Sequence, residues 1–381
     1  MSDRTRVLIA LCLILGLAAG CSLPVEFLAP AQPAPSATAA PTATEPPIPT
    51  ATRTATVTPT STITPTPTAT EIVFSFGREL TIDYLRAQEF TGSKIVFEQK
   101  LADRSNYHRY LASYLSEGNR IYGLLTIPFG DPPEGGFKAI VFNHGYIPPG
   151  VYRTTERYVA YVDYLARSGF VVFKIDYRGH GDSEGEAAGS YFHPGYTIDA
   201  INAFKSLQKM ENVDPDGIGM WGHSMAGNVT LRAMLVEPEI KAGVIWAGAV
   251  YSYADLVEYG ITDSTYRPPP TLTPASGEEE SPLRFSDNIF EIYGRPDLSE
   301  PYWQAVSLTM NLDYLSSPLQ IHHAEDDTVV SIAYSYELAE SLLALGKRYE
   351  FYVYESGGHN LESSAFLPAL QRTVAFFEDN L

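Results

Sequence analysis

From about residue 72 to its end, the chain is a succession of short apolar runs and longer amphipathic stretches. The segments before residue 130 predict a short helix followed by antiparallel strands. From residue 139 onward the apolar runs become nearly continuous, as expected of buried parallel strands, and helical stretches alternate with them. The predicted strands are 94–99, 107–115, 121–127, 139–143, 170–175, 218–221, 244–247, 319–323 and 350–353, and the predicted helices are 80–90, 154–167, 198–210, 226–235, 331–345 and 366–377.

This alternation predicts the fold class. In the segment 198–210, Ile198, Ile201 and Phe204 fall on one face of a helix, which is typical of a helix packed on a sheet. Repeated strand–helix units favour an α/β domain with a mostly parallel sheet and helices on both faces. We expect this folded domain to span residues 72–381.

The alternation breaks between residues 251 and 317. This stretch contains three consecutive prolines at 268–270 and three consecutive glutamates at 278–280. We expect a lid-like insertion over the functional site, and a simple surface excursion is the alternative.

The first twenty residues have the pattern of a targeting segment. Arg4 and Arg6 precede an apolar run over 7–19, and the run ends in Ala-Ala-Gly-Cys at 18–21. This ending resembles the lipobox of bacterial lipoproteins, although Ala18 stands where Leu is commoner. We therefore expect a signal peptide over 1–20, lipidation of Cys21, and an exported chain anchored to the outer face of a bacterial membrane. The alternative is an ordinary N-terminal anchor, for which the run is short, since a spanning helix needs about 20 apolar residues.

Residues 21–71 are dominated by Pro, Thr and Ala, which predicts a disordered tether that holds the domain away from the membrane. Cys12 and Cys21 are the two cysteines of the sequence. After processing and lipidation no thiol would remain, which excludes disulfides, cysteine catalysis and thiolate metal sites. The formal charge of −19, from 26 Lys and Arg against 45 Asp and Glu, argues against nucleic acid as a partner.

The most informative motif is Gly-His-Ser-Met-Ala-Gly at 222–227. It directly follows the predicted strand 218–221 and opens the next helix, which is the strand–turn–helix context of a G-x-S-x-G nucleophile elbow. Ala226 replaces the usual second glycine but is still small. We expect Ser224 to be a nucleophile, with an ordinary turn serine as the alternative.

A serine hydroxyl needs a base, and the elbow pattern places an acid and then a histidine after later strands. His359 follows the last predicted strand in a Gly-Gly-His loop and is the candidate base. Asp327 lies three residues before Val330 and is the preferred acid, with Asp326 as its competitor and Glu325 a distant third. The run 322–327 could also suggest a metal cluster, but adjacent strand residues point to opposite faces, so no metal site is expected.

An acyl-transfer intermediate also needs donors for its oxyanion. The backbone N–H groups of Met225, directly after the nucleophile, and of Tyr146, in the loop after strand 139–143, are the candidates. We expect His144 and His223 to be structural. The charged residues of 176–183 are expected to brace loops near the site.

At this point the chain from about residue 121 to 381 resembles an α/β hydrolase. Val213-Asp214-Pro215 before the nucleophile strand, and Asp199 in the preceding helix, are similar to the catalytic domain of the prolyl oligopeptidase family. That family includes dipeptidyl and acylaminoacyl peptidases and neighbouring esterases. The resemblance implies a triad of Ser224, Asp327 and His359.

The sequence also departs from that family. Ala324 stands where Gly is usual in the acid loop, and Ser331 stands where Pro is usual. The roughly 65 folded residues before residue 139 contain no blade-like repeat, so no β-propeller is expected.

The expected activity is hydrolysis of small esters, amides or short peptides through an acyl-enzyme, without a cofactor. Peptidase and carboxylesterase remain open, as do haloperoxidase and thioesterase chemistry on the same triad. A non-catalytic tethered binding protein is the alternative of a different class, and a damaged triad would be its sign. The sequence does not determine the oligomeric state.

Overall fold

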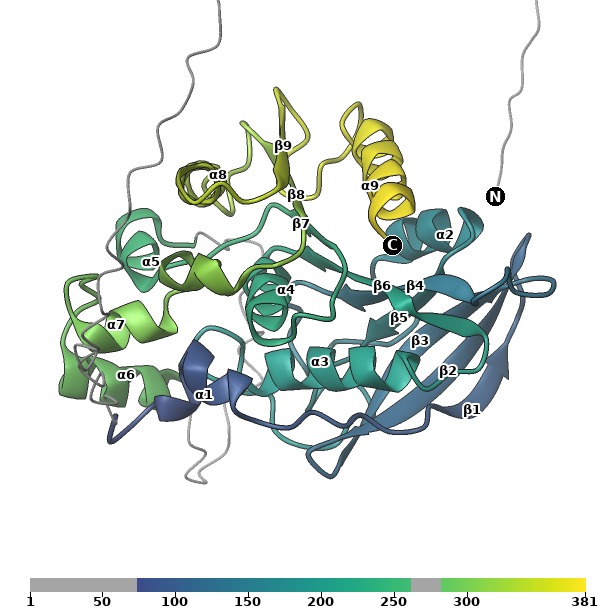
Figure 1. Cartoon of the computed structure of the whole chain (residues 1–381), viewed down its shortest axis with the longest axis horizontal. Helices are drawn as coiled ribbons and strands as arrows, with labels where there is room; N and C mark the ends of the chain where they lie inside the picture. The colour runs from purple at the N-terminus through teal and green to yellow at the C-terminus, as the bar shows by residue number, and fades with distance from the viewer. Residues whose placement is uncertain (1–73, 262–281) are drawn as a thin grey trace, which may run out of the picture. The chain divides into compact units, whose positions relative to one another are not determined.

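The computed structural model describes residues 74–261 and 282–381 (Figure 1). The predicted signal peptide, the tether, Cys21 and the runs at 268–270 and 278–280 lie outside the described residues. Among the described residues, no helix has both the length and the apolar character that a membrane crossing requires.

A nine-stranded sheet runs through the described residues in the order β1-β2-β3-β5-β4-β6-β7-β8-β9. β1, β2 and β3 form an antiparallel lead-in, and β3 pairs antiparallel with β5. From β5 to β9 neighbouring strands are parallel. The strands are β1 (Val96–Leu101), β2 (Tyr107–Ser116), β3 (Asn119–Pro128), β4 (Phe137–Asn143), β5 (Val171–Ile175), β6 (Val213–His223), β7 (Gly243–Trp246), β8 (Leu319–Ala324) and β9 (Tyr349–Tyr354).

Helices cover both faces of this sheet (Figure 1). One face carries α1 (Ile82–Arg86), α3 (Gly195–Leu207), α4 (Met225–Val236) and α8 (Ala333–Ala344), and the short helix η1 (Arg78–Leu80) precedes α1. The other face carries α2 (Val159–Arg167) and α9 (Phe366–Asn380), which pack against each other. The predicted α/β fold class is confirmed.

The core explains why the central strands are continuous apolar runs. Ile140 and Phe142 of β4 pack under α2 and α9, whereas Ala139 and Val141 pack under α3 and α4, so both faces of the strand are buried. Because parallel strands end at the same edge, the loops after β4, β6, β8 and β9 meet there.

The structure has an element at each predicted strand and helix, but several bounds differ. The helix predicted over 80–90 is divided into η1 and α1 by Thr81, whose backbone is extended, and it ends at Arg86. The strand predicted over 218–221 begins earlier, as β6 at Val213. The helix predicted over 154–167 begins later, as α2 at Val159. Tyr158 explains the difference, because its φ of 58° lies in the left-handed region and breaks the right-handed helix.

The described part of the 251–317 stretch is helical. It comprises α5 (Tyr253–Tyr259), α6 (Pro282–Tyr293), α7 (Pro301–Val306) and the 3₁₀ helix η3 (Thr309–Tyr314). A separate hydrophobic cluster, formed by Tyr253, Ile289, Tyr302, Trp303 and Val306, joins α5, α6 and α7 to Leu80 of η1. Since α5 follows β7, which lies between β6 and β8, the stretch leaves the sheet at the edge where the candidate site residues meet.

Candidate active site

Ser224 lies at a tight turn between β6 and α4. Its φ of 57° and ψ of −123° are unusual for a residue with a side chain. The backbone N–H of Ser224 donates to the Trp246 carbonyl at 3.0 Å, and its carbonyl accepts from the Gly227 N–H at 2.8 Å. A side chain at position 222 would collide with Thr230 and the Ala226 backbone, and one at 227 would lie 2.6 Å from Gly248 Cα. These two glycines therefore allow the close packing that holds the strained turn.

The three residues predicted as a triad come together at the ends of β6, β8 and β9. Ser224 Oγ lies 2.9 Å from His359 Nε2, and His359 Nδ1 lies 2.8 Å from Asp327 Oδ2. The Asp327 side chain is fully buried, whereas the His359 ring is 16% exposed. This is the linear order of nucleophile, base and acid that acyl transfer requires.

The Asp327 carboxylate is surrounded by hydrogen-bond donors. Oδ1 accepts from the backbone N–H groups of Val329 at 2.8 Å and Val330 at 3.0 Å. Oδ2 accepts from His359 and also from His323 Nε2 at 3.2 Å. Burial by itself raises the pKa of Asp327, but the hydrogen bonds from His323, His359 and the backbone outweigh it and hold the pKa well below its ordinary value. The carboxylate therefore stays ionised beside His359.

Asp326, the competing candidate for the acid, has a different set of partners. Its Oδ1 accepts from the backbone N–H groups of Gly357 at 2.9 Å and Gly358 at 2.7 Å, directly before His359. Asp326 thus binds the backbone of the loop that carries His359, whereas Asp327 binds the His359 side chain. Glu325 is exposed, and its backbone N–H donates to the Tyr354 carbonyl at 2.8 Å.

The loop after β4 passes directly against the nucleophile. A Cβ on Gly145 would lie 3.1 Å from Ser224 Cβ, so this backbone reaches the serine because it has no side chain there. Tyr146 follows and is half exposed. Met225 is the first residue of α4, so its N–H has no partner within the helix. Met225 thus adjoins Ser224 in the chain, and Tyr146 follows the glycine that packs against Ser224.

The histidines predicted to be structural are buried. Burial lowers the pKa of His144 well below its ordinary value, and its two ring nitrogens face the carbonyls of Gly145 and Asp176. His223 is bound between Tyr158 Oη, 2.7 Å from Nδ1, and the His359 carbonyl, 2.8 Å from Nε2. The contact between His223 and the base loop was not predicted from the sequence.

The charged residues after β5 contact neighbouring loops. Asp176 accepts from Tyr152 Oη at 2.7 Å and Thr154 Oγ1 at 2.6 Å, and burial raises its pKa to about 6. Arg178 Nη2 lies 2.8 Å from the fully buried Asp199 Oδ1. These contacts brace the loop after β5 against α3 and the segment before α2.

The run at 322–327 does not gather ligands for a metal. His322 bonds to Gln320 and Tyr354, whereas His323 bonds to Ser335, Asp327 and the Val330 carbonyl. Within the part of the chain that the structure describes, no group of three or more His, Cys, Asp or Glu residues is arranged to hold a metal ion.

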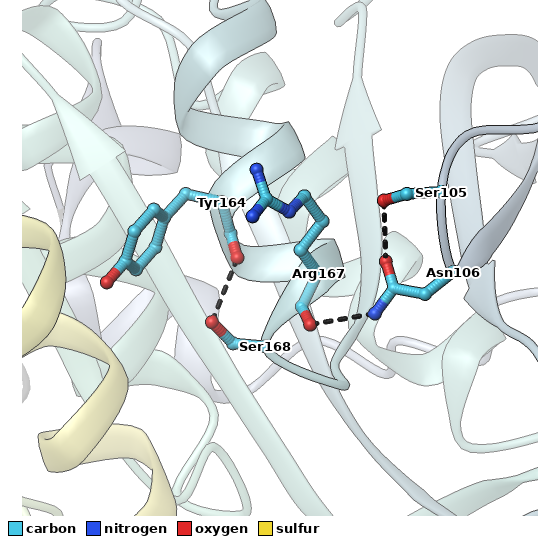
Figure 2. A pocket seen from close by; sticks show the side chains of 5 residues that line it. All are labelled: Ser105, Asn106, Tyr164, Arg167 and Ser168. Carbon is cyan, nitrogen blue, oxygen red and sulfur yellow. Dashed lines mark hydrogen bonds between the residues drawn. The ribbon is translucent and has the colours of Figure 1, made fainter.

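A cavity of about 380 Å³ lies away from these residues. Figure 2 shows its lining side chains, Ser105, Asn106, Tyr164, Arg167 and Ser168. Arg167 ends α2 and β5 begins at Val171, so the cavity lies at the amino ends of the parallel strands, opposite Ser224. Some of its polar groups already form hydrogen bonds with one another: Asn106 Nδ2 donates to the Arg167 carbonyl at 2.9 Å, and Ser168 Oγ donates to the Tyr164 carbonyl at 2.9 Å (Figure 2).

Comparisons with known proteins agree with this fold. Residues 137–270 match the model of the serine aminopeptidase family S33. "Uncharacterized peptidase YtmA" of Bacillus subtilis (strain 168) is 28% identical over 275 residues, which cover 70% of this chain and 91% of that protein.

Two solved structures illustrate the range of neighbours. An acetyl xylan esterase from Paenibacillus sp. R4 has a TM-score of 0.56 at 19% identity, covering 79% of this chain and 92% of that one. The Pyrococcus horikoshii acylaminoacyl peptidase has a TM-score of 0.55 at 21% identity, covering 73% of this chain and 42% of that one.

The chain therefore has the α/β-hydrolase fold, and the proteins to which it is similar include esterases and peptidases. The predicted resemblance to the prolyl oligopeptidase catalytic domain is confirmed at the level of the fold, since an acylaminoacyl peptidase is among the structural neighbours.

Proposed function

We propose that this chain is an exported serine hydrolase that cleaves carboxylic esters or amides through an acyl-enzyme on Ser224. The continuous chain from Ser224 Oγ through His359 to Asp327, with contacts of 2.9 and 2.8 Å, carries the proposal. The left-handed φ of Ser224 supports it, because strain of this kind is maintained where the surrounding structure over-determines a functional residue.

In the acylation step, Ser224 Oγ attacks the substrate carbonyl carbon while His359 Nε2 takes the hydroxyl proton. Asp327 accepts from His359 Nδ1 and stabilises the imidazolium that forms. The same proton then passes from His359 to the leaving alcohol or amine, and the bond between the carbonyl carbon and that group breaks. In deacylation, water loses a proton to His359, attacks the ester carbon, and releases the acid with Ser224 restored.

The backbone N–H groups of Met225 and Tyr146 would stabilise the negative charge on the carbonyl oxygen. Met225 also begins α4, and the amino end of a helix favours a developing negative charge. Each of these steps uses groups of the chain itself and water.

The substrate class that the structure favours is a small ester. Residues 74–136 form η1, α1 and three antiparallel strands. The described residues therefore include no β-propeller of the kind that limits the peptidases to short peptides. The acetyl xylan esterase is covered over 92% of its length, compared with 42% for the acylaminoacyl peptidase. Peptidase activity is the second candidate, favoured by the name of the Bacillus subtilis relative.

A fluorophosphonate probe tests the nucleophile without knowledge of the substrate. We expect the wild type to be labelled and the Ser224→Ala variant to remain unlabelled. Ser168→Ala is a matched control. The Ser168 hydroxyl donates to the Tyr164 carbonyl and lies near the amino ends of the parallel strands, away from Ser224. Labelling that persists in Ser224→Ala, or a folded wild type that is never labelled, would refute the proposal, and the second result would favour a binding protein. Acyl esters compared with aminoacyl anilides then separate esterase from peptidase.

The anchoring is tested separately in a bacterial host. We expect the full chain to incorporate radiolabelled palmitate and the Cys21→Ala variant to incorporate none. The variant protein should also disappear from the membrane fraction. Equal incorporation in both proteins, or none in either, would contradict lipidation of Cys21.

A further inference from the structure

Two side chains connect the loop after β4 to the loop that carries His359. The Gly145 N–H donates to Tyr158 Oη at 3.0 Å. Tyr158 Oη lies 2.7 Å from His223 Nδ1, and His223 Nε2 lies 2.8 Å from the backbone carbonyl oxygen of His359. We call Tyr158 and His223 the bridge, since their hydrogen bonds span the site from the predicted oxyanion loop to the base.

The partners of the bridge determine where each proton lies. The His359 carbonyl can only accept, so His223 Nε2 carries the hydrogen. In a neutral imidazole the other nitrogen then accepts, so Tyr158 Oη donates to Nδ1 while its lone pair receives the Gly145 N–H. Each donor therefore faces an acceptor, and one arrangement of protons satisfies the whole bridge.

Burial keeps this arrangement in place. The His223 side chain is 2% exposed, and burial lowers its pKa to about 3, so the ring remains neutral around pH 7. Its centroid lies 4.6 Å from that of the His359 ring. A neutral His223 does not oppose the positive charge that His359 gains when it takes the Ser224 proton, whereas a charged ring at this distance would.

The bridge also fixes the clearance between the oxyanion loop and the nucleophile. A Cβ on Gly145 would lie 2.7 Å from Tyr158 Oη and 3.1 Å from Ser224 Cβ, so the backbone of Gly145 fits between the two residues. Tyr158 is itself held in the left-handed region, with φ at 58°, immediately before α2. The position of its hydroxyl is therefore set by both the turn and the helix that follows.

We propose that Tyr158 and His223 are positioning residues that set the oxyanion loop and the base at their working separation. This inference rests on the proposed acyl-transfer function. Neither side chain needs to contact the reacting atoms, because Tyr158 acts through the Gly145 backbone and His223 through the His359 backbone. Loss of the bridge should therefore impair transition-state geometry more than substrate binding.

The test compares kcat and KM of the full chain on an ester that the wild type hydrolyses. We expect Tyr158→Phe to lower kcat by about 10- to 100-fold while KM changes by less than about threefold, the size of effect that a small misplacement of catalytic groups produces. Tyr107→Phe is the matched control, since it also removes a tyrosine hydroxyl with a part-buried 2.7 Å bond, to Asp163 of the same helix α2. We expect that control to keep kcat within about twofold of the wild type.

His223 provides a second arm, should Tyr158→Phe fail to fold. His223→Gln can keep an N–H directed at the His359 carbonyl, whereas His223→Phe cannot, so we expect the Gln variant to retain at least about tenfold more kcat than the Phe variant.

Two results would overturn the inference while leaving the proposed function intact. One is a kcat of Tyr158→Phe equal to that of Tyr107→Phe while activity still depends on Ser224. The other is equal loss in His223→Gln and His223→Phe, which would indicate packing alone. Hydrolysis that persists in Ser224→Ala would instead refute the function itself.

Discussion

Exchanging the carboxylate of Asp327 for an amide is the sharpest test of the acid assignment. In Asp327→Asn the side-chain oxygen must stay at the position of Oδ1, because the N–H groups of Val329 and Val330 both donate to it. The amide NH₂ is then forced to the position of Oδ2, facing His359 Nδ1 and His323 Nε2. Two donors cannot share a hydrogen bond, so His359 must present an unprotonated Nδ1 and carry its proton on Nε2.

That tautomer cannot accept the proton of Ser224. The expected loss of kcat is on the order of 10⁴-fold, or about 5 kcal/mol of transition-state stabilisation at roughly 1.4 kcal/mol for each factor of ten. The fold should tolerate the change, because the amide has nearly the same shape and keeps both backbone bonds.

Asp326→Asn is the matched control. Its Oδ1 accepts from Gly357 and Gly358, and an amide oxygen can accept from both. We expect its kcat to remain within about threefold of the wild type. The assay measures hydrolysis together with the second-order rate of fluorophosphonate labelling, and circular dichroism confirms folding. If Asp326→Asn were the inactive variant and Asp327→Asn remained active, the acid assignment and the tautomer argument would both be wrong.

Three further changes test other parts of the site. Gly145→Ala places a Cβ 2.7 Å from Tyr158 Oη, and the forced shift of the loop should lower kcat by on the order of 10²-fold with little change in the melting temperature. His323→Leu removes one of the donors to Asp327 and should lower kcat about tenfold, whereas full activity would show that His359 and the backbone alone suffice. Burial raises the pKa of Asp176 to about 6, so the folded state holds this proton more tightly than the unfolded state. The free energy of unfolding of the protein should therefore fall as pH rises from about 4 to 6. Urea unfolding of the wild type and Asp176→Asn should therefore show the wild type losing up to about 3 kcal/mol relative to the variant between pH 4 and pH 7, and parallel pH profiles would contradict this.

Much of the site could be predicted because the fold orders it along the chain. The elbow is local: a buried strand, a small-residue turn and a helix within 218–235 are visible in the sequence, and the structure places Ser224 at that turn. The base and the acid follow strands that periodicity also identifies. Their meeting depends only on parallel strands ending at one edge.

The supporting contacts could not be predicted, since they join segments with no shared periodicity. Tyr158 and His223 are 65 residues apart in sequence, and His223 and His359 are 136 apart. A partial signal was available: His223 occupies the position before the nucleophile, where the strand is still buried, and a buried imidazole requires partners for both nitrogens. The identity of those partners is set by the tertiary structure, which brings Tyr158 and His359 to the two ring nitrogens.

The pair Asp326–Asp327 shows the same limit. Both carboxylates follow β8, and spacing to Val330 favours Asp327 without assigning a task to its neighbour. In the structure adjacent side chains diverge, so one reaches the imidazole of His359 and the other reaches the backbone that carries it. Asp326 and Asp327 therefore have different roles: Asp327 contacts the imidazole of His359, and Asp326 contacts the backbone of its loop.

The described part of the 251–317 stretch is tied to the body of the domain by buried aromatic contacts. Tyr302 of α7 stacks on Tyr293 of α6 at 3.8 Å between ring centroids, and Tyr293 Oη donates to the Phe76 carbonyl at 2.7 Å. Trp303 is fully buried in the same cluster with Leu80, and the α1 helix that follows Leu80 packs against α4, which begins directly after Ser224. Displacing α6 and α7 would expose this aromatic surface, and fully burying a large side chain stabilises by about 1.5 to 3 kcal/mol. These helices therefore form a fixed wall, and their displacement as part of a lid would require local unfolding of the cluster.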